Sequence, residues 1–287
     1  MLNRRALTYE AAQEAADARD AAGVQQDVPI CAYDLAHVLN ASVRFVDVNM
    51  EGIYERGPPA RILLSPYRPL VRRTFNCAHE LGHHRFGHGS TIDELKSSSA
   101  NKLQSELPEE VLANAFAGFV LMPGIAIQRT LYRRGISATN ASPLDLYKIA
   151  CDFGVGYTTL VTHMTYSLDE LGNRRKQELE KWTPNDLRRM VLGYVDPSPV
   201  VVLDELGEAS TAELECEYGL VVPTGSQTDG VGLAFEKHLA NGDLFRAAAV
   251  GLTRVQMKSR FVDVRIMPKK FIGLARFRYM ESFDDKT

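Results

Sequence analysis

Apolar positions recur with two different spacings in the first part of the chain, and each spacing predicts a different kind of element. Residues 9–22 are rich in alanine and in alternating charges and end at Gly23, which predicts a surface helix. Residues 30–39 predict a second helix. Residues 42–48 alternate apolar and polar side chains and residues 60–64 form an apolar run, so two short strands are expected there.

Two longer helices are expected after these strands. One begins near residues 65–68 and ends near Gly87 and Gly89, because glycine commonly follows the last turn of a helix. The other spans residues 105–122, with Pro108 in its first turn. Residues 111–122 are apolar nearly all round, which is typical of a buried helix.

The pattern changes twice in the second half of the chain. Residues 142–167 hold two short helical patterns around a turn at 152–156, the spacing of a helix-turn-helix. A charged stretch and several prolines follow, which predicts a domain junction between residues 180 and 199. Short β-like runs among glycine-rich turns then indicate an α+β domain; they are 200–203, 220–223, 261–267 and 271–277.

Composition and charge exclude several classes of protein. The 287 residues are 45% hydrophobic and carry a net charge of -3, without a polybasic block, so charge does not favour nucleic-acid binding. The longest apolar stretch, residues 115–127, is interrupted by Pro123 and falls short of the roughly 20 residues that cross a bilayer. The N-terminus lacks the apolar core of a signal peptide. We therefore expect a cytoplasmic protein without a transmembrane helix.

The four cysteines give no sign of a disulfide framework or of a zinc ribbon, because they lie far apart and form no CxxC pair. Cys77 is close to the histidines described next, but on a helix it points about 200° away from His79. We interpret it as a packing residue.

Residues 79–83, with the sequence His-Glu-Leu-Gly-His, carry the clearest chemistry. On a helix, His79 and His83 project from one face, about 40° apart and about 6 Å along the axis, close enough to share a metal. Glu80 lies beside them and can take a proton from a metal-activated water. This is the core of a zinc peptidase. The alternative is a partly exposed helix whose histidines lie on one face without binding a metal.

A peptidase site needs a third protein ligand, and His84, His88 and an acid from the later helix are the candidates. The metzincin arrangement is excluded, because it requires glycine and histidine where this chain has Phe86 and Gly89. His84 points about 100° away from its neighbour His83 and cannot comfortably join the same coordination sphere.

Glu110 is the acid that we favour as the third ligand. It lies 27 residues beyond His83, near the start of the buried apolar helix, where an acid needs a partner. Asn114 lies one turn later on the same face. The alternative is that Glu110 only complements the helix dipole, a role that Glu109 could serve equally.

Taken together, these residues resemble the ImmA/IrrE family of metallopeptidases over about residues 25–165. The resemblance rests on the motif at 79–83 and on the residues after it, namely His88, Glu110, Asn114, Phe116, Ala117 and the Leu-Met-Pro run at 121–123. It implies a cytoplasmic, gluzincin-like protease in which His79, His83 and Glu110 bind the metal and Glu80 is the catalytic base. Zn²⁺ is the expected ion, although such a ligand set also accepts Mn²⁺ or iron.

The resemblance also implies a biological role and a domain layout. The substrate would be a DNA-binding transcriptional repressor whose cleavage induces DNA-repair genes after radiation or desiccation. We expect a multidomain α+β protein with a zinc-peptidase-like catalytic domain at 1–125, a helix-turn-helix-like helical domain at 126–182 and a GAF-like α+β domain at 183–287. GAF-like folds often sense small molecules, so a signal ligand is expected in the last domain.

Two other functions compete with this interpretation. The first is a DNA-binding regulator, but the would-be recognition helix, residues 157–166, holds His163 and no lysine or arginine. The second is a ligand-sensing protein with a purely structural metal. Against it, three protein ligands leave a fourth position open, whereas structural zinc usually fills all four.

The group that would stabilise the oxyanion stays open at this stage. Such a group must donate a hydrogen bond or carry positive charge near the scissile carbonyl. The sequence offers four candidates near the motif, which are Tyr67, His84, Arg85 and His88.

Overall fold

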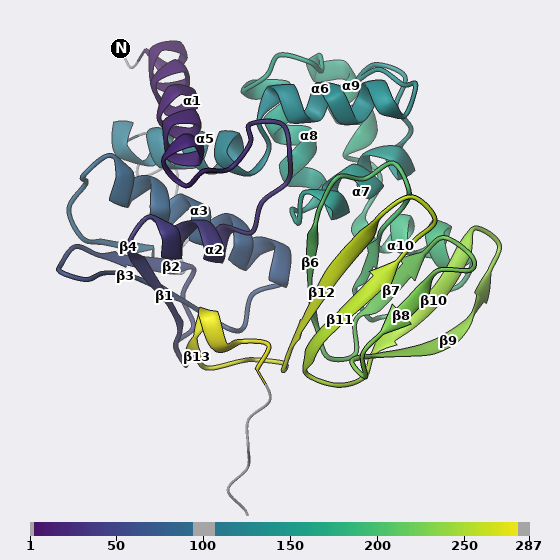
Figure 1. The fold of residues 1–287 in the computed structure, drawn as a ribbon. Coiled ribbons are helices and arrows are strands. Elements are labelled where there is room, and N and C mark those ends of the chain that lie inside the picture. The colour runs from purple at the N-terminus through teal and green to yellow at the C-terminus, as the bar shows by residue number, and fades with distance from the viewer. Residues whose placement is uncertain (1–2, 94–106, 281–287) are drawn as a thin grey trace, which may run out of the picture.

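The fold was analysed in a computed structural model that describes residues 3–93 and 107–280 (Figure 1). A five-stranded sheet in the order β13-β1-β3-β2-β4 supports the first part of the chain. Strands β1 and β3 are parallel, and the other neighbours are antiparallel. The strands are β1 Ala41–Phe45, β2 Gly52–Glu55, β3 Ala60–Leu64, β4 Thr91–Asp93 and β13 Gly273–Leu274.

Among the described residues four helices accompany this sheet, and α3 carries the His-Glu-Leu-Gly-His motif. They are α1 Arg4–Ala21, α2 Ala32–Val38, α3 Leu70–Arg85 and α5 Pro108–Leu121. Helix α3 ends as predicted, because Gly87 adopts a φ of 66° and the amide of His88 donates to the carbonyl of His83 at 3.0 Å. Helix α5 begins with Pro108, whose missing N–H costs nothing at that position.

Several sequence-based boundaries needed correction. Helix α3 begins at Leu70 rather than at 65–68, because Pro69 has an extended backbone and precedes the first turn. Strand β2 was not predicted at all. The predicted start of the next helix at residue 105 lies outside the described residues. The surface helix predicted at residues 9–22 is confirmed, but it begins earlier, at Arg4. It buries one alanine face against α5, formed by Ala11, Ala15 and Ala18.

Five helices form the middle of the chain, in the upper right of Figure 1. Helices α7 and α8 are the two short helices predicted from the sequence, and Gly154 makes the turn between them with a φ of 64°. Ser142 and Asp145 cap α7 reciprocally in a capping box. The five helices are α6 Gly124–Arg133, α7 Pro143–Asp152, α8 Tyr157–Tyr166, α9 Asn173–Leu179 and α10 Pro184–Leu192.

The last part contains two four-stranded sheets that share one apolar core. One sheet has the order β5-β7-β10-β9, with β5 Val200–Val202, β7 Gly219–Val222, β9 Leu233–Leu239 and β10 Gly242–Ala247. The other has the order β6-β12-β11-β8, with β6 Thr211–Glu215, β8 Gln227–Asp229, β11 Gly251–Gln256 and β12 Phe261–Met267. The predicted runs at 200–203, 220–223 and 261–267 therefore coincide with strands.

The chain then returns from the last part to the first sheet (Figure 1). Strand β13 pairs with the edge of β1, and the short 3-10 helix η1 Ala275–Phe277 follows it. The Arg278 side chain is buried, lies over the Tyr33 ring of α2 and donates to Glu213 of β6. The run predicted at 271–277 thus connects two parts of the molecule instead of extending the C-terminal sheets.

The apolar segment Pro108–Arg133 is long and hydrophobic enough to cross a membrane by length and composition alone, with a mean hydropathy of 1.7. Two observations favour a core segment. Within its apolar window, 67% is buried inside the protein, and the segment is divided into α5 and α6 at Pro123. A buried, interrupted helix of this kind is typical of a hydrophobic core.

Candidate metal centre

A close approach between helices α3 and α5 creates the centre. Gly82 makes this approach feasible, because a Cβ atom there would lie 3.0 Å from the Cα and 3.3 Å from the carbonyl oxygen of Ala113. These atoms belong to the backbone of α5 and have little freedom to move. Glycine at position 82 therefore lets α5 lie against the face of α3 that carries the two histidines.

His79, His83 and Glu110 come together on these two helices, and all three are buried. One potential ligand atom from each lies within 4.8 Å of the others. The Nε2 atoms of the two histidines are 3.1 Å apart, and the Glu110 oxygens lie 3.5 Å from Nε2 of His79 and 3.7 Å from Nε2 of His83.

These separations fit a tetrahedral metal site. Ligand atoms about 2.0–2.1 Å from a common ion, at tetrahedral angles, lie about 3.3 Å from one another. The separation of the two histidine nitrogens lies close to that value, and the two Glu110 distances, which involve different oxygens of its carboxylate, are somewhat longer. Nitrogen and oxygen are also donor types that zinc, manganese and iron accept, so both the geometry and the chemistry of the donor set suit a divalent metal.

The structure distinguishes the two acids at the start of α5. Glu110 is buried among the histidines, whereas Glu109 is exposed. Asn114, one turn after Glu110, is exposed as well. A ligand role therefore suits Glu110, and the helix-dipole role alone suits Glu109.

His88 supports the centre from outside the three-ligand cluster. Its Nδ1 atom lies 2.8 Å from Nδ1 of His83, and its ring is stacked on Phe86. If Nε2 of His83 held a metal, its Nδ1 would carry the proton and donate a hydrogen bond to Nδ1 of His88. This hydrogen bond would fix both the tautomer and the ring orientation of His83. The sequence had offered His88 only as a ligand or an oxyanion donor.

Glu80 is only 1% exposed and lies against strand β2. A Cβ atom at Gly52, the first residue of β2, would lie 2.6 Å from Oε1 of Glu80 and 3.0 Å from its Cγ. The glycine therefore provides the space that the carboxylate occupies. Sequence reasoning missed Gly52, since a glycine before a short strand gives no local sign of such a contact.

The three other candidates for the oxyanion role have partners elsewhere. His84 accepts from the Tyr54 hydroxyl at 3.1 Å and donates to the Leu39 carbonyl at 3.3 Å, and burial lowers its pKa. Arg85 pairs with Glu14 of α1 at 2.6 Å. The Tyr67 hydroxyl donates to Asp47. His84 is thus a structural residue that ties α3 to the segment before β1.

The comparison with protein families concerns the part of the chain that contains this centre. Residues 25–164 match the family model described as the IrrE N-terminal-like domain. The match supports the ImmA/IrrE family. Its range includes α3 and α5, and hence His79, His83 and Glu110 as well as Glu80. No curated protein matches the chain.

The family match and the cluster agree on the general chemistry. The matched family is one of metallopeptidases, and a buried His-His-Glu cluster is compatible with a bound metal. Cys77 of α3 is fully buried, as expected for a packing residue. The four cysteines are free thiols, although Cys31, Cys151 and Cys216 are half-buried rather than fully enclosed.

Proposed function

We propose that the protein is a metal-dependent endopeptidase of the gluzincin type, with His79, His83 and Glu110 as metal ligands and Glu80 as the catalytic base. The observation that carries this proposal is the buried cluster of three ligand atoms within 4.8 Å of one another. A structural zinc site would usually have a fourth protein ligand, and the cluster found among the described residues has three. An open coordination position is what a hydrolytic site requires.

Each residue of the centre has a defined task in this mechanism. A bound Zn²⁺ or Mn²⁺ would polarise the scissile carbonyl and lower the pKa of water. Glu80 takes a proton from the attacking water at its carboxylate and later delivers it to the leaving amine. Gly52 leaves Glu80 the space to do so, and the hydrogen bond from His83 to His88 holds that imidazole in position.

The proposed substrate is a helix-turn-helix transcriptional repressor, and its cleavage would induce DNA-damage genes after radiation or desiccation. The match to the IrrE N-terminal-like domain supports this part of the proposal. We further propose that the order of the three parts corresponds to that of the Deinococcus radiation-response protein IrrE. In this proposal the helices at 126–182 form a helix-turn-helix-like domain, residues 183–287 form a GAF-like domain and the protein acts in the cytoplasm.

Direct DNA binding is the weaker alternative. Helix α8, which would be the recognition helix, buries most of its side chains, including Tyr157, Leu160 and His163. Burial lowers the pKa of His163 to about 4, so this side chain is uncharged at neutral pH. A helix that holds no lysine or arginine is poorly suited to phosphates and guanine edges. A contact with the protein substrate is the better role for this region.

The decisive experiment compares wild type, Glu80→Gln and Glu109→Gln, each loaded separately with Zn²⁺ and Mn²⁺ and incubated with a helix-turn-helix repressor from the same organism. We expect Glu80→Gln to retain the metal and to lose cleavage by at least about 100-fold, because it cannot accept a proton. Glu109→Gln, on the same helix as Glu110 but exposed, should cleave like wild type. Equal cleavage by Glu80→Gln and wild type would reject the mechanism.

A further inference from the structure

Glu51 lies immediately before Gly52 in the chain and binds side chains on and just before helix α3. Its Oε1 atom accepts from Nε of Arg68 at 2.9 Å, and its Oε2 atom accepts from Nε of Arg72 at 2.9 Å. The Nδ2 atom of Asn76 donates to the same Oε2 at 2.9 Å and to the Glu51 carbonyl oxygen at 3.1 Å. One glutamate thus joins the start of β2 to the first turns of the helix that carries the proposed base.

The contacts of Glu51 differ in how strongly they can hold the two elements together. The side chains of Glu51 and Arg68 are only 18% and 16% exposed, so water screens their ion pair weakly. Arg72 is 59% exposed and contributes less. Asn76 binds both the side chain and the backbone of Glu51. Arg68 and Asn76 therefore provide most of the restraint.

The contact between Asn76 and Glu51 sets the position of β2 along the helix. Asn76 and Glu80 lie four residues apart and project from the same face of α3. Glu51 meets Asn76, and the next residue, Gly52, lies against Glu80, where a Cβ atom would be 2.6 Å from Oε1. A shift of β2 that broke the first contact would also move the backbone against which the Glu80 carboxylate packs.

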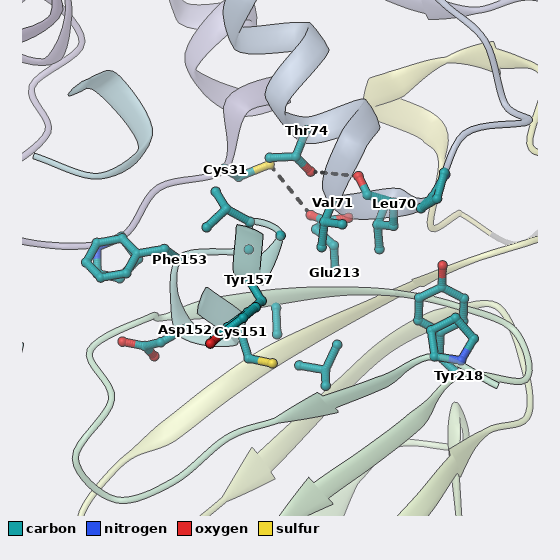
Figure 2. A pocket seen from close by; sticks show the side chains of 18 of the residues that line it. Cys31, Leu70, Val71, Thr74, Cys151, Asp152, Phe153, Tyr157, Glu213 and Tyr218 are labelled. Carbon is teal, nitrogen blue, oxygen red and sulfur yellow. Dashed lines mark hydrogen bonds between the residues drawn. The ribbon is translucent and has the colours of Figure 1, made fainter. Parts of the chain in front are cut away.

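The other side of the first turns of α3 faces a cavity of about 390 Å³ (Figure 2). Leu70, Val71 and Thr74 border this cavity, and the helical repeat places them on the side of α3 opposite Asn76. A cavity provides fewer packing atoms than a filled core. The contacts on the Glu51 side therefore contribute more to holding these turns than they would in a closely packed helix.

We propose that Glu51 is a positioning residue for Glu80: it holds the start of β2 against α3 and so fixes the Glu80 carboxylate beside Gly52. This inference rests on the proposed function, because Glu80 is the base only in that mechanism. The side chains that bind Glu51 all precede His79 in the chain. Loss of Glu51 should therefore slow the chemical step and leave metal and substrate binding unchanged.

The kinetic test compares repressor cleavage by wild type, Glu51→Ala and Asn76→Ala under saturating metal. We expect kcat to fall at least about tenfold in each variant, because a displacement of about 1 Å at a reacting group costs about 100-fold. KM and the metal affinity, measured by chelator competition, should not change. The double variant should be no slower than the slower single variant, since both remove the same contact.

Glu55→Ala is the matched control. Glu55 also lies on β2, but it pairs with Arg61 of β3 at 2.9 Å instead of with α3, so this variant should cleave like wild type. Wild-type kcat in Glu51→Ala would overturn the proposal. An equal fall in Glu55→Ala, or a loss of metal that matches the loss of activity, would overturn it as well.

A second readout needs neither metal nor cleavage. In metal-free, full-length protein labelled with carbon-13 at the glutamate carboxylates, the Glu80 resonance is identified by its absence in Glu80→Gln. At constant pH this resonance should shift in Glu51→Ala and in Asn76→Ala and stay in place in Glu55→Ala. An unchanged resonance in Glu51→Ala would overturn the proposal even if kcat fell. A wild-type protein without cleavage would instead reject the proposed function, and the resonance would still decide whether Glu51 positions Glu80.

Discussion

Gly52→Ala is the substitution that most directly tests how the catalytic base is positioned. The added methyl group would lie 2.6 Å from Oε1, 3.0 Å from Cγ and 3.1 Å from Cδ of Glu80. Non-bonded heavy atoms reach their optimal separation at about 3.5 Å or more, so the carboxylate oxygen would overlap the methyl group by nearly 1 Å. Since Glu80 is only 1% exposed, it has little space into which to retreat.

Two magnitudes follow from this overlap. Forcing a methyl group into a packed site destabilises a protein by about 1–3 kcal/mol. A displacement of about 1 Å at a reacting group lowers the rate by about 100-fold. Metal affinity should change little, because the methyl group contacts the base and not the three ligands. The expected result is a fall in kcat of about 100-fold with metal binding retained.

The assay measures repressor cleavage under saturating metal, together with metal affinity by competition with a chelator. Gly57→Ala is the matched control, because its Cβ would meet nothing closer than the Pro59 carbonyl oxygen at 3.7 Å. Wild-type turnover in Gly52→Ala would refute the reasoning. A loss of metal in proportion to the loss of activity would refute it as well.

A double-mutant cycle separates this contact from a general disturbance of strand β2. Glu80→Asp shortens the base and removes Oε1 and Cδ, of which Oε1 is the atom that would lie nearest to the new methyl group. In that background Gly52→Ala should cost much less than about 100-fold, since neighbouring substitutions are not additive. Equal losses in both backgrounds would show that the methyl group acts through the strand instead.

Three further predictions concern the proposed ligands and their supports, and a fourth concerns the buried His163. Glu110→Ala should weaken metal binding by more than about 100-fold in a chelator competition, whereas Glu109→Ala should leave it unchanged. The opposite result would assign the role of third ligand to Glu109. His88→Ala should weaken the same affinity about 10–100-fold, and an unchanged value would remove its role in orienting His83. Gly82→Ala should push α5 away and reduce metal affinity before it affects turnover at saturating metal. In the folded protein the pKa of His163 is lowered to about 4, so the unfolded chain binds more protons than the folded one between pH 6.5 and 4. The free energy of unfolding should therefore fall by about 3 kcal/mol as the pH drops through this range. Urea unfolding of His163→Gln should lack this loss.

The features that follow from local sequence were predictable. The four-residue spacing of His79 and His83 fixes their common face on any helix, whatever surrounds it. Pro108 and Gly87 mark helix ends through their own backbone preferences, and the structure places both where the sequence did. Strand β3 coincides with the predicted run at 60–64, because its side chains alternate between buried and less buried positions.

The features that the sequence did not reveal depend on partners outside the element itself. Strand β2 has only four residues and begins with glycine, so it is defined by its pairing with β3 and β4 rather than by its composition. Strand β13 pairs with β1 across more than two hundred residues. The alanine face of α1 looks weakly apolar in isolation, and only the approach of α5 makes it a buried interface.

The difference between local sequence signals and contacts with other elements explains why the proposed ligands were easier to find than the residues that position them. The residue types alone indicate a metal site at His79, His83 and Glu110, because their side chains carry the donor atoms that metals require. Gly52 and Gly82 contribute only the absence of a side chain, and that absence has meaning only beside Glu80 and beside the backbone of α5. Gly52 leaves space for Glu80, the proposed base, and Gly82 lets α5 approach with Glu110, the proposed third ligand. Because these are separate contacts, substitutions at the two glycines should separate the chemical step from metal binding.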